Sequence, residues 1–257
     1  MNNTLIFFVP LYNPKNIFFN QYELIIKYGY SIVFYLNSEI DSDINNQLKT
    51  LDKQKCHILG DNTNKGISKS INIAFTQFKR FNYLLFLDQD TLINISEFDQ
   101  HFRTNLSIYN EIPIVYFYNS DKPPFFITNS GCLFNNNKFD LVIKENYFVE
   151  FVDYWIYLKS ISLDYIIIKK RSDFIDHKSS QNDLTKVKNF TFKCYSNARI
   201  IEIFKNGFQL IYEVIFYMSF SKRTLKFQII KLLISELLNS FLNYLFCVFF
   251  AFKEKDI

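Results

Sequence analysis

The sequence predicts an α/β fold organised around a largely parallel sheet with helices on its faces. Short apolar runs end abruptly at polar residues, and the clearest is the run at 83–87, which stops at Asp88. A run that is apolar at every position is typical of a parallel strand buried on both faces. Amphipathic stretches separate these runs, and such alternation is typical of doubly wound sheets. Hydrophobic residues make up 49% of the chain, which is enough for a packed core and argues against disorder.

The first third of the chain alternates strands and helices. Residues 5–9 form an apolar run ended by a turn-prone segment with two prolines, and residues 31–36 are rich in β-branched and aromatic side chains, so both are predicted strands. Apolar residues recur at helical spacing within 17–28, which predicts a helix. The other elements predicted here are a short helix at 44–51, a strand at 56–59, a helix at 68–79 and the strand at 83–87.

The pattern continues beyond this point with longer connections. Residues 114–118 form a further predicted strand, and a proline-rich turn follows at 122–124. Residues 148–161 have helical spacing, and 165–169 form an apolar strand. Residues 177–189 are polar and predict a loop, and from Phe190 onward the pattern is helical and strongly apolar.

The chain divides by charge into a body, residues 1–185, and a tail, residues 186–257. The body carries 18 Lys/Arg against 20 Asp/Glu, whereas the tail carries 11 against 5 and has a net charge of +6. Basic segments attract nucleic acid or anionic lipid. Because the charges of the tail alternate with long apolar runs, we expect a helical, membrane-prone region that lies on lipid, and no nucleic-acid partner.

Two other interpretations of the tail remain open. Residues 229–252 are long enough to span a bilayer, although Glu236, Asn239 and Asn243 would be costly to bury in lipid. The same helices could instead form an appendage packed on the body or an oligomer interface.

The four cysteines are widely spaced and form no CxxC pair. This pattern argues against a zinc site or a disulfide framework and favours reduced thiols. The N-terminal segment has no basic start, and its apolar run stops at Pro10, so we expect no secretory signal. The cysteines are Cys56, Cys132, Cys194 and Cys247.

The sharpest candidate for chemistry is the acidic motif Asp88-Gln89-Asp90, which follows the predicted strand at 83–87 directly. Two carboxylates at a strand end can share one hard cation, and Mg²⁺ or Mn²⁺ held in this way can bind a diphosphate. Taken alone, two acids in a loop are more often simply solvated. The interpretation as a metal site therefore depends on the surrounding sequence.

Four further segments support it. A polar turn with two glycines at 60–67 precedes the helix that carries Asn72, and such turns offer backbone N–H groups to a phosphate or a sugar. The small-residue turn at 128–132 lets backbone approach a ligand closely. Asp153 lies near a predicted helix start, where an acid is also favoured by the helix dipole alone. Asp176-His177 follows a strand-like segment.

Together these segments resemble glycosyltransferase family 2, and within it the rhamnosyltransferase-like branch. They occur in the order of that family and at about its spacing, over roughly residues 4–180, with a weaker echo at 195–199. The LDQD form of the acidic motif is more specific than a bare DxD. The resembling segments are Val9–Pro14, Asn64–Ile67 with Asn72, Phe86–Thr91, Ser130-Gly131, Tyr147–Asp153 and Asp176-His177.

The resemblance implies a GT-A-type nucleotide-sugar-binding sheet and a role for each matching residue. Asp88 and Asp90 would hold Mg²⁺ or Mn²⁺ with the donor's diphosphate, His177 would complete that metal site, and Asp153 would be the catalytic base. The remaining residues implied to bind the nucleotide-sugar are Pro10, Tyr12, Asn13, Asn37, Asn64, Gly66, Asn72, Asp88 and Gly131.

Three residues depart from the pattern of the family. Asn37 stands where the family usually has an aspartate, Trp155 stands where an acid is common, and Lys159 replaces an arginine. Lysine keeps the charge but loses the bidentate fork of arginine. These departures bear on the donor and on the acceptor geometry, whereas the metal and base positions match.

We therefore expect an inverting glycosyltransferase that uses dTDP-rhamnose or a UDP-hexose and a lipid-diphosphate-linked saccharide acceptor. The resemblance implies a role in O-antigen or capsule biosynthesis, at the cytoplasmic face of the bacterial inner membrane as a peripheral protein. One alternative is a catalytically degenerate GT-A protein acting as a membrane-bound assembly partner. Another is a DxD phosphatase-like hydrolase, against which Leu92 stands at the position of a required Thr or Val.

Overall fold

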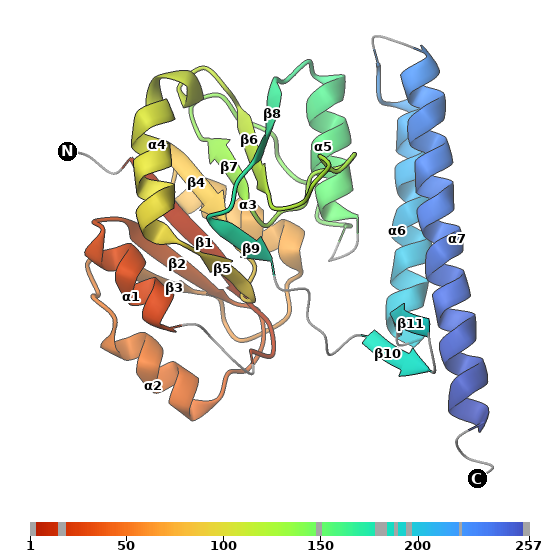
Figure 1. Cartoon of the computed structure of the whole chain (residues 1–257), viewed down its shortest axis with the longest axis horizontal. Helices are drawn as coiled ribbons and strands as arrows, with labels where there is room; N and C mark the ends of the chain where they lie inside the picture. Colours follow the sequence, from red (N-terminus) through yellow and green to blue (C-terminus); the bar gives the residue numbers. More distant parts are fainter. Residues whose placement is uncertain are drawn as a thin grey trace. The chain divides into compact units, whose positions relative to one another are not determined.

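The computed structural model describes residues 4–14, 19–147, 151–177, 184–187, 190–193, 197–220 and 223–253. The chain divides into two compact units, Met1–Lys178 and Ser179–Ile257. The first is an α/β unit and the second carries two long helices (Figure 1). Residues 148–150 of the predicted helix start, part of the predicted loop at 177–189, Cys194 and Tyr195 lie outside the described residues, and so does the side chain of His177.

The first unit is built on a seven-stranded sheet with the order β3-β2-β1-β4-β7-β6-β8. Neighbouring strands are parallel except at β7, which runs antiparallel to both β4 and β6. This mostly parallel sheet confirms the predicted α/β class. The strands are β1 (Leu5–Leu11), β2 (Ser31–Leu36), β3 (Cys56–Leu59), β4 (Tyr83–Phe86), β6 (Ile114–Tyr118), β7 (Cys132–Asn135) and β8 (Ile167–Arg171).

Both faces of the sheet are covered, as the apolar run of β4 predicts. On one face, Phe7 of β1 packs edge-on against Phe98 of α4 (Ile95–Tyr109), with ring centroids 5.6 Å apart. On the other, Phe134 of β7 meets Phe75 of α3 (Ile67–Gln77) at 5.3 Å. All four residues of β4 are buried. The other helices of this unit are α1 (Phe19–Lys27), α2 (Ser42–Thr50) and α5 (Val152–Ser162).

Several elements were not predicted. Helix α4 has apolar residues at helical spacing, of which Ile95, Phe98 and Phe102 are buried, and its N-cap Asn94 donates to Glu97 at 2.8 Å. Charged and polar residues on its outer side obscured this period. Strand β7 was not predicted, and only the turn at 128–132 that leads into it was expected. Two short strands, β5 (Thr91–Ile93) and β9 (Ile175–His177), form a separate antiparallel pair.

The second unit begins with strands and not with helix. The antiparallel pair of β10 (Leu184–Val187) and β11 (Phe190–Lys193) shows that the prediction of helix from Phe190 was wrong for its first residues, since alternating aromatic and polar side chains favour a strand. The helices are α6 (Asn197–Phe216) and α7 (Arg223–Lys253). Within the described residues, no helix has a stretch long and apolar enough to cross a bilayer.

Gly131, the residue before β7, lies where two backbone segments approach closely beside the acidic motif. Its φ is +87°, and a Cβ there would lie 2.5 Å from the Phe117 carbonyl oxygen. We predict that Gly131→Ala lowers the free energy of unfolding by about 3 kcal/mol, because it adds a backbone clash to the strain of a positive φ. Urea denaturation measures this change.

Gly29 provides the matched control. Its φ of +93° is similar, but a Cβ would meet nothing within 4 Å. Gly29→Ala should therefore cost only the strain of a positive φ, about 1 kcal/mol. Equal losses in the two variants would show that the close approach at Gly131 contributes nothing.

Candidate functional site

The acidic loop 88–91 leaves the sheet at the carboxyl end of β4 and is fixed by the turn before β7. The Asp88 backbone N–H donates to the Ser130 hydroxyl at 3.0 Å, and that hydroxyl lies 2.6 Å from the Thr91 hydroxyl. The Gly131 N–H donates to the Phe86 carbonyl at 2.9 Å. Because β7 runs antiparallel, its beginning meets the end of β4, and the predicted Ser130-Gly131 turn supports Asp88 through the backbone.

Gln89, the middle residue of the acidic motif, connects that motif to the loop after β1. Its amide oxygen accepts from the Tyr12 N–H at 2.8 Å, and its amide nitrogen donates to the Tyr12 carbonyl at 3.1 Å. This reciprocal pair holds the backbone of Tyr12, whose side chain is half exposed, next to the acidic loop. The sequence analysis assigned no role to Gln89, and its position between two acids was the available signal.

Gln21 of α1 fixes the other end of the acidic loop. Its buried amide donates to the Thr91 carbonyl at 3.0 Å and accepts from the Ile93 N–H at 3.1 Å. Burial raises the pKa of the neighbouring Tyr22 hydroxyl, and the Asp90 carboxylate raises that pKa further, so Asp90 lies near α1. A glutamine on the buried side of an amphipathic helix was the signal that the sequence analysis missed.

His177 reaches the same place through backbone pairing. Strand β9 pairs with β5 in a register that sets His177 opposite Thr91, the residue after Asp90. The Asn94 N–H also donates to the Phe174 carbonyl at 2.8 Å, which anchors β9 to the start of α4. The backbone of His177 therefore lies beside the residue that follows the acidic motif, and its role as a metal ligand stays a prediction.

The donor set suits a divalent cation that also binds substrate. Within the described residues, no group of three or more His, Cys, Asp or Glu side chains is arranged to hold a metal by itself. Asp88 and Asp90 offer two carboxylates at one strand end, both partly exposed. Mg²⁺ is commonly held by one or two carboxylates, with substrate phosphates and waters completing its shell, and Asp88 and Asp90 fit that pattern.

Several predicted nucleotide-binding residues gather at the carboxyl ends of β1 and β2. The Asn13 N–H donates to the Ser38 hydroxyl at 2.7 Å, and buried Asn37 accepts from the Lys65 N–H at 2.7 Å. Pro10, which is buried, pairs with Tyr35 in β2. The side chain of Asn37 thus holds the loop at 60–66 against the end of β2.

The loop at 60–66 leads into α3 through a turn that favours glycine. The Asn64 side chain accepts from the Gly66 N–H at 3.1 Å, and Gly66, the N-cap of α3, has a φ of +78° and makes no side-chain cap. Amide groups at such a helix start are suited to bind an anion. Asn64 is exposed, whereas Gly66 itself is buried.

Asn72 has a different position from the other predicted nucleotide-binding residues. Its amide nitrogen donates to the Ile143 carbonyl at 2.7 Å and its amide oxygen accepts from the Ile143 N–H at 2.9 Å. The Ser68 hydroxyl donates to the Tyr147 carbonyl from the same helix. These contacts fasten the segment that leads to α5 onto α3, so the described role of Asn72 is structural.

Asp153 lies in the first turn of α5, where it accepts from the Tyr154 N–H at 2.9 Å. Phe151, the N-cap, has a φ of +66°, so the chain turns sharply just before the helix. Trp155 packs against Tyr147 and is buried, so this departure from the family pattern fills the core. A helix N-terminus favours a negatively charged side chain such as that of Asp153.

Asp88 and Asp153 both act electrostatically on Cys132, the first residue of β7. Burial raises the pKa of the Cys132 thiol well above its usual range, and the carboxylates of Asp153 and Asp88 raise it further. The ammonium of Lys169 acts on the same thiol in the opposite direction. The acidic loop, the start of α5 and β8 therefore meet in one region, although they lie far apart in the sequence.

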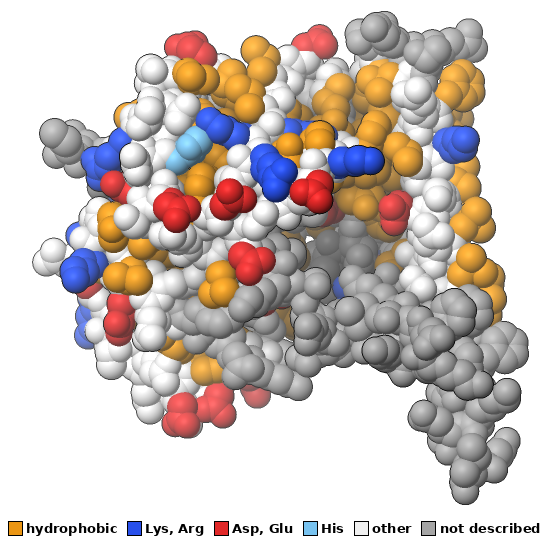
Figure 2. Space-filling view, in the orientation of Figure 1, with side chains coloured by type: hydrophobic (Ala, Val, Ile, Leu, Met, Phe, Trp, Pro, Cys, Tyr) orange, Lys and Arg blue, Asp and Glu red, His pale blue; other side chains and the backbone are white. Residues whose placement is uncertain are grey.

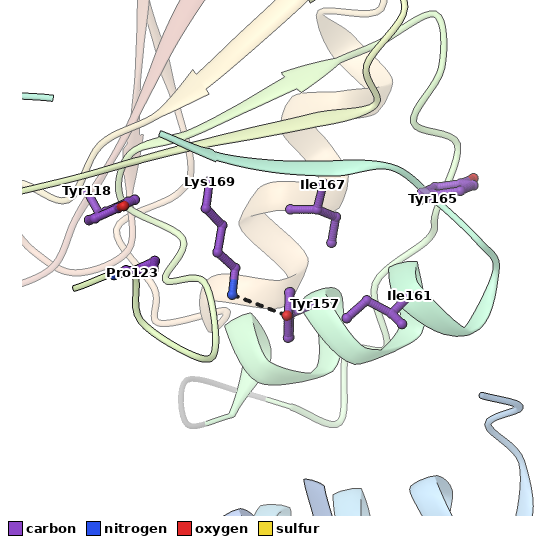
Figure 3. Close-up of a pocket in the computed structure, with 7 residues that line it drawn as sticks. All are labelled: Tyr118, Pro123, Tyr157, Ile161, Tyr165, Ile167 and Lys169. Carbon is purple, nitrogen blue, oxygen red and sulfur yellow. Dashed lines mark hydrogen bonds between the residues drawn. The ribbon is translucent and has the colours of Figure 1, made fainter. Parts of the chain in front are cut away.

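Lys169 of β8 is at the centre of an aromatic pocket beside α5 (Figure 3). Its ammonium donates to the carbonyls of Pro124, at 2.8 Å, and Phe125, and to the Tyr157 hydroxyl at 3.2 Å. The pocket has a volume of about 490 Å³. Its lining is formed by Tyr118, Pro123, Tyr157, Ile161, Tyr165, Ile167 and Lys169.

The pocket lies beside α5, which lines it with Tyr157 and Ile161. Tyr157 is one helical turn after Asp153, so the two side chains lie on the same side of the helix. Phe126 stacks on Tyr154 with ring centroids 4.1 Å apart and an interplanar angle of 17°. Lys169 and these rings together dock the segment at 124–126 against the first two turns of α5.

Comparisons with known proteins find similarity in structure only. No protein-family model matches the chain, and no curated protein matches it in sequence. TarS of S. aureus, residues 1–349 in complex with UDP, superposes with a TM-score of 0.60 at 16% identity, over 91% of this chain and 70% of that one. The chain spans 43% of a longer TarS structure.

A second glycosyltransferase has the same fold. Glucosyl-3-phosphoglycerate synthase of Mycobacterium tuberculosis, solved with Mn²⁺, UDP and phosphoglyceric acid, superposes with a TM-score of 0.52 at 10% identity. The superposition covers 70% of this chain and 72% of that one. At these identities the likeness is one of fold, and it confirms the expected GT-A-type fold. The rhamnosyltransferase-like branch and the roles of the site residues remain predictions.

Lys169 provides a test of how the pocket is held together. We predict that Lys169→Met lowers the free energy of unfolding by about 1–3 kcal/mol, because it leaves the Pro124 and Phe125 carbonyls without their donor. Lys170→Met is the matched control, since the only hydrogen bond described for Lys170 is 3.5 Å long, to Asn105. Thermal and urea unfolding should show that Lys169→Met is less stable than Lys170→Met. Identical stabilities would show that Lys169 does not hold the segment.

Proposed function

We propose that this protein is an inverting glycosyltransferase that transfers a sugar from a nucleoside diphosphate. The observation that carries the proposal is the acidic loop at the carboxyl end of β4, together with Asp153 in the first turn of α5, in a unit with the fold of known glycosyltransferases. The Asp88 and Asp90 carboxylates face the leaving diphosphate, and the Asp153 carboxylate serves the acceptor. Sugar transfer requires this division of roles.

The donor is a dTDP- or UDP-sugar bound at the carboxyl ends of β1, β2 and β4. TarS has been solved with UDP-GlcNAc as well as UDP, which supports a donor of this class. The loops that hold Tyr12, Asn37 and Gly66 are joined to one another and to the acidic loop by the hydrogen bonds described above. Gln89 joins the loop after β1 to the acidic loop. The residues that bind the nucleotide and those that bind the diphosphate therefore belong to one hydrogen-bonded network.

In the proposed reaction, the Asp153 carboxylate takes the proton of an acceptor hydroxyl. The hydroxyl oxygen forms a bond to the anomeric carbon, and the bond from that carbon to the diphosphate oxygen breaks. The nucleoside diphosphate leaves with the electron pair. Mg²⁺ or Mn²⁺, when bound, neutralises charge on this leaving group, and Asp88 and Asp90 would hold it, with His177 as a third candidate ligand. Structures of glucosyl-3-phosphoglycerate synthase with Mn²⁺ and with Mg²⁺ support this requirement.

The aromatic pocket is the place for the acceptor. Tyr118, Tyr157 and Tyr165 present aromatic rings, on which the apolar faces of sugars stack, and Tyr157 is one turn from Asp153. The acceptor we propose is a saccharide on a lipid diphosphate, in the synthesis of a surface polysaccharide such as O-antigen or capsule. Rhamnose is the proposed sugar, on the basis of the LDQD motif, with a UDP-hexose as the alternative.

The metal site can be tested through nucleotide binding. We expect UDP or dTDP to bind only with Mn²⁺ or Mg²⁺ present, and Asp90→Asn to weaken that binding by a factor of about 10 or more, because one metal ligand is lost. Isothermal titration of each nucleotide with and without metal measures this. Asp173→Asn, in the exposed segment before β9, is the control and should bind as the wild type does. Binding that is absent for every nucleotide would support a degenerate scaffold instead.

Substitution of Asp153 distinguishes an effect on the chemical step from an effect on nucleotide binding. We expect Asp153→Asn to lower kcat by a factor of about 10²–10⁴, since the general base is removed, while nucleotide affinity stays within about twofold. Asp164→Asn at the far end of α5 is the matched control, because Asp164 is exposed and its positive φ of 56° suits asparagine. Turnover of the donor in the presence of acceptor gives both values. Full activity of Asp153→Asn would remove it from the mechanism.

A further inference from the structure

Helices α6 and α7 of the second unit pack against each other as an antiparallel pair. Gly207 of α6 lies directly on α7, since a Cβ there would be 2.4 Å from the Leu237 side chain. Near the turn, the Lys226 ammonium donates to the Ile215 carbonyl at 2.6 Å. Buried apolar residues recur at helical spacing along this seam. They are Ile203, Leu210 and Val214 of α6, and Ile229, Leu233 and Leu237 of α7.

A second set of apolar residues on the same helices is exposed. Their exposed fractions run from 40% to 67%. On each helix they recur at intervals of three, four and seven residues, which places them along one face. In α6 they are Ile201, Phe208, Tyr212, Ile215 and Phe216, and in α7 they are Phe227, Ile234, Leu238, Phe241 and Leu242.

The two stripes meet beside the seam. Phe204, which adjoins the α6 stripe and stacks on Phe208, also meets Phe241 of the α7 stripe at a centroid distance of 5.9 Å. From this contact each stripe continues around the outside of its own helix, since Tyr212 is two residues from both Leu210 and Val214 of the seam and so points away from α7. Hydrophobic side chains run along the outer edge of α7 in Figure 2. We call this surface, made of the ten residues above, the apolar face.

Two lysines lie within the apolar face, whereas the described acids of the two helices lie outside it. Lys205 lies between Ile201 and Phe208 in the α6 stripe, and Lys231 lies between Phe227 and Ile234 in the α7 stripe. The acids lie elsewhere on their helices. Glu236 is two residues from both Ile234 and Leu238 and so points away from their stripe. Glu213 is buried and accepts from Gln209 at 3.0 Å, and Glu202 pairs with Asn206 at 3.4 Å.

We propose that the apolar face inserts into an anionic lipid surface, with Lys205 and Lys231 extending to the headgroups. The Phe and Tyr rings of the face suit the boundary between headgroups and acyl chains, and lysine stems can lie along apolar surface while the ammonium stays in water. Charge decides against a second copy of the chain as the occupant. Residues 186–257 have a net charge of +6, which repels a second copy and attracts anionic lipid. This inference does not depend on the proposed sugar transfer.

The test is cosedimentation of the full chain with vesicles, in the absence of donor and acceptor. We expect binding to vesicles of phosphatidylcholine and phosphatidylglycerol in equal parts, weaker binding to phosphatidylcholine alone, and loss of affinity as salt rises. Leu238→Glu should weaken binding to the anionic vesicles by a factor of at least about 10, because it places a charge in the part of the face that enters the lipid. Asn239→Glu adds the same charge one residue away, on the polar side of α7, and should change binding by less than about threefold.

Lys231→Gln is a second variant that leaves the apolar face intact. It should weaken binding to anionic vesicles by a factor of about five and leave binding to neutral vesicles unchanged. Circular dichroism confirms that each variant keeps its helices. The proposal is overturned by equal binding to both kinds of vesicle, by no binding to either, or by equal losses in Leu238→Glu and Asn239→Glu. A dimer in lipid-free solution that Leu238→Glu dissolves would also overturn it and assign the face to a second copy.

Discussion

The structure of the first unit depends on the burial of β4 on both faces. Every residue of this strand is covered, by α4 and its neighbours on one side and by α3 on the other. A carboxylate cannot stay in such surroundings without a large desolvation cost, so the chain leaves the sheet at Asp88. The boundary between the apolar core and solvent therefore coincides with the start of the acidic loop. The same burial that stabilises the sheet places the two carboxylates at its edge.

Much of this arrangement follows from the sequence because burial on two faces leaves a distinctive pattern. Strands β2, β3 and β6 have the bounds predicted for them, and the acidic loop lies at the end of a buried strand as expected. Other features leave no such mark. The first three residues of β7 are apolar, and such a short run reads the same in either direction, so its sequence cannot reveal that the strand runs antiparallel. The pairing of β5 with β9 joins segments more than 80 residues apart and depends on backbone geometry alone.

The candidate site shows the same division. The acids and the glycine-containing turns were found from sequence because their chemistry or their backbone freedom is unusual. Gln21 and Gln89 were missed, although they hold the acidic loop to α1 and to the loop after β1. Their contribution lies in amide groups that bond to backbone, and the position of Gln89 between two acids and of Gln21 on the buried side of α1 marks these residues without showing what their amides bind. Lys169 belongs to the same class, since a cation in an edge strand predicts solvent and not three donated hydrogen bonds within the protein.

The reversed strand β7 has a consequence for the way mutations combine. Strand β7 ends at the amino-terminal ends of the parallel strands, away from the acidic loop. The chain must therefore return along the sheet before it can begin α5. On the way it is clipped to α3 at Ile143 and Tyr147 by Asn72 and Ser68. Helix α3, from the half of the unit that we propose binds the nucleotide, is thus joined to the segment that leads into the helix of Asp153. Substitutions in α3 and in α5 should be epistatic, because residues that share a hydrogen-bonded segment do not contribute independently. Neither half of the unit can then evolve a new partner without adjustment in the other.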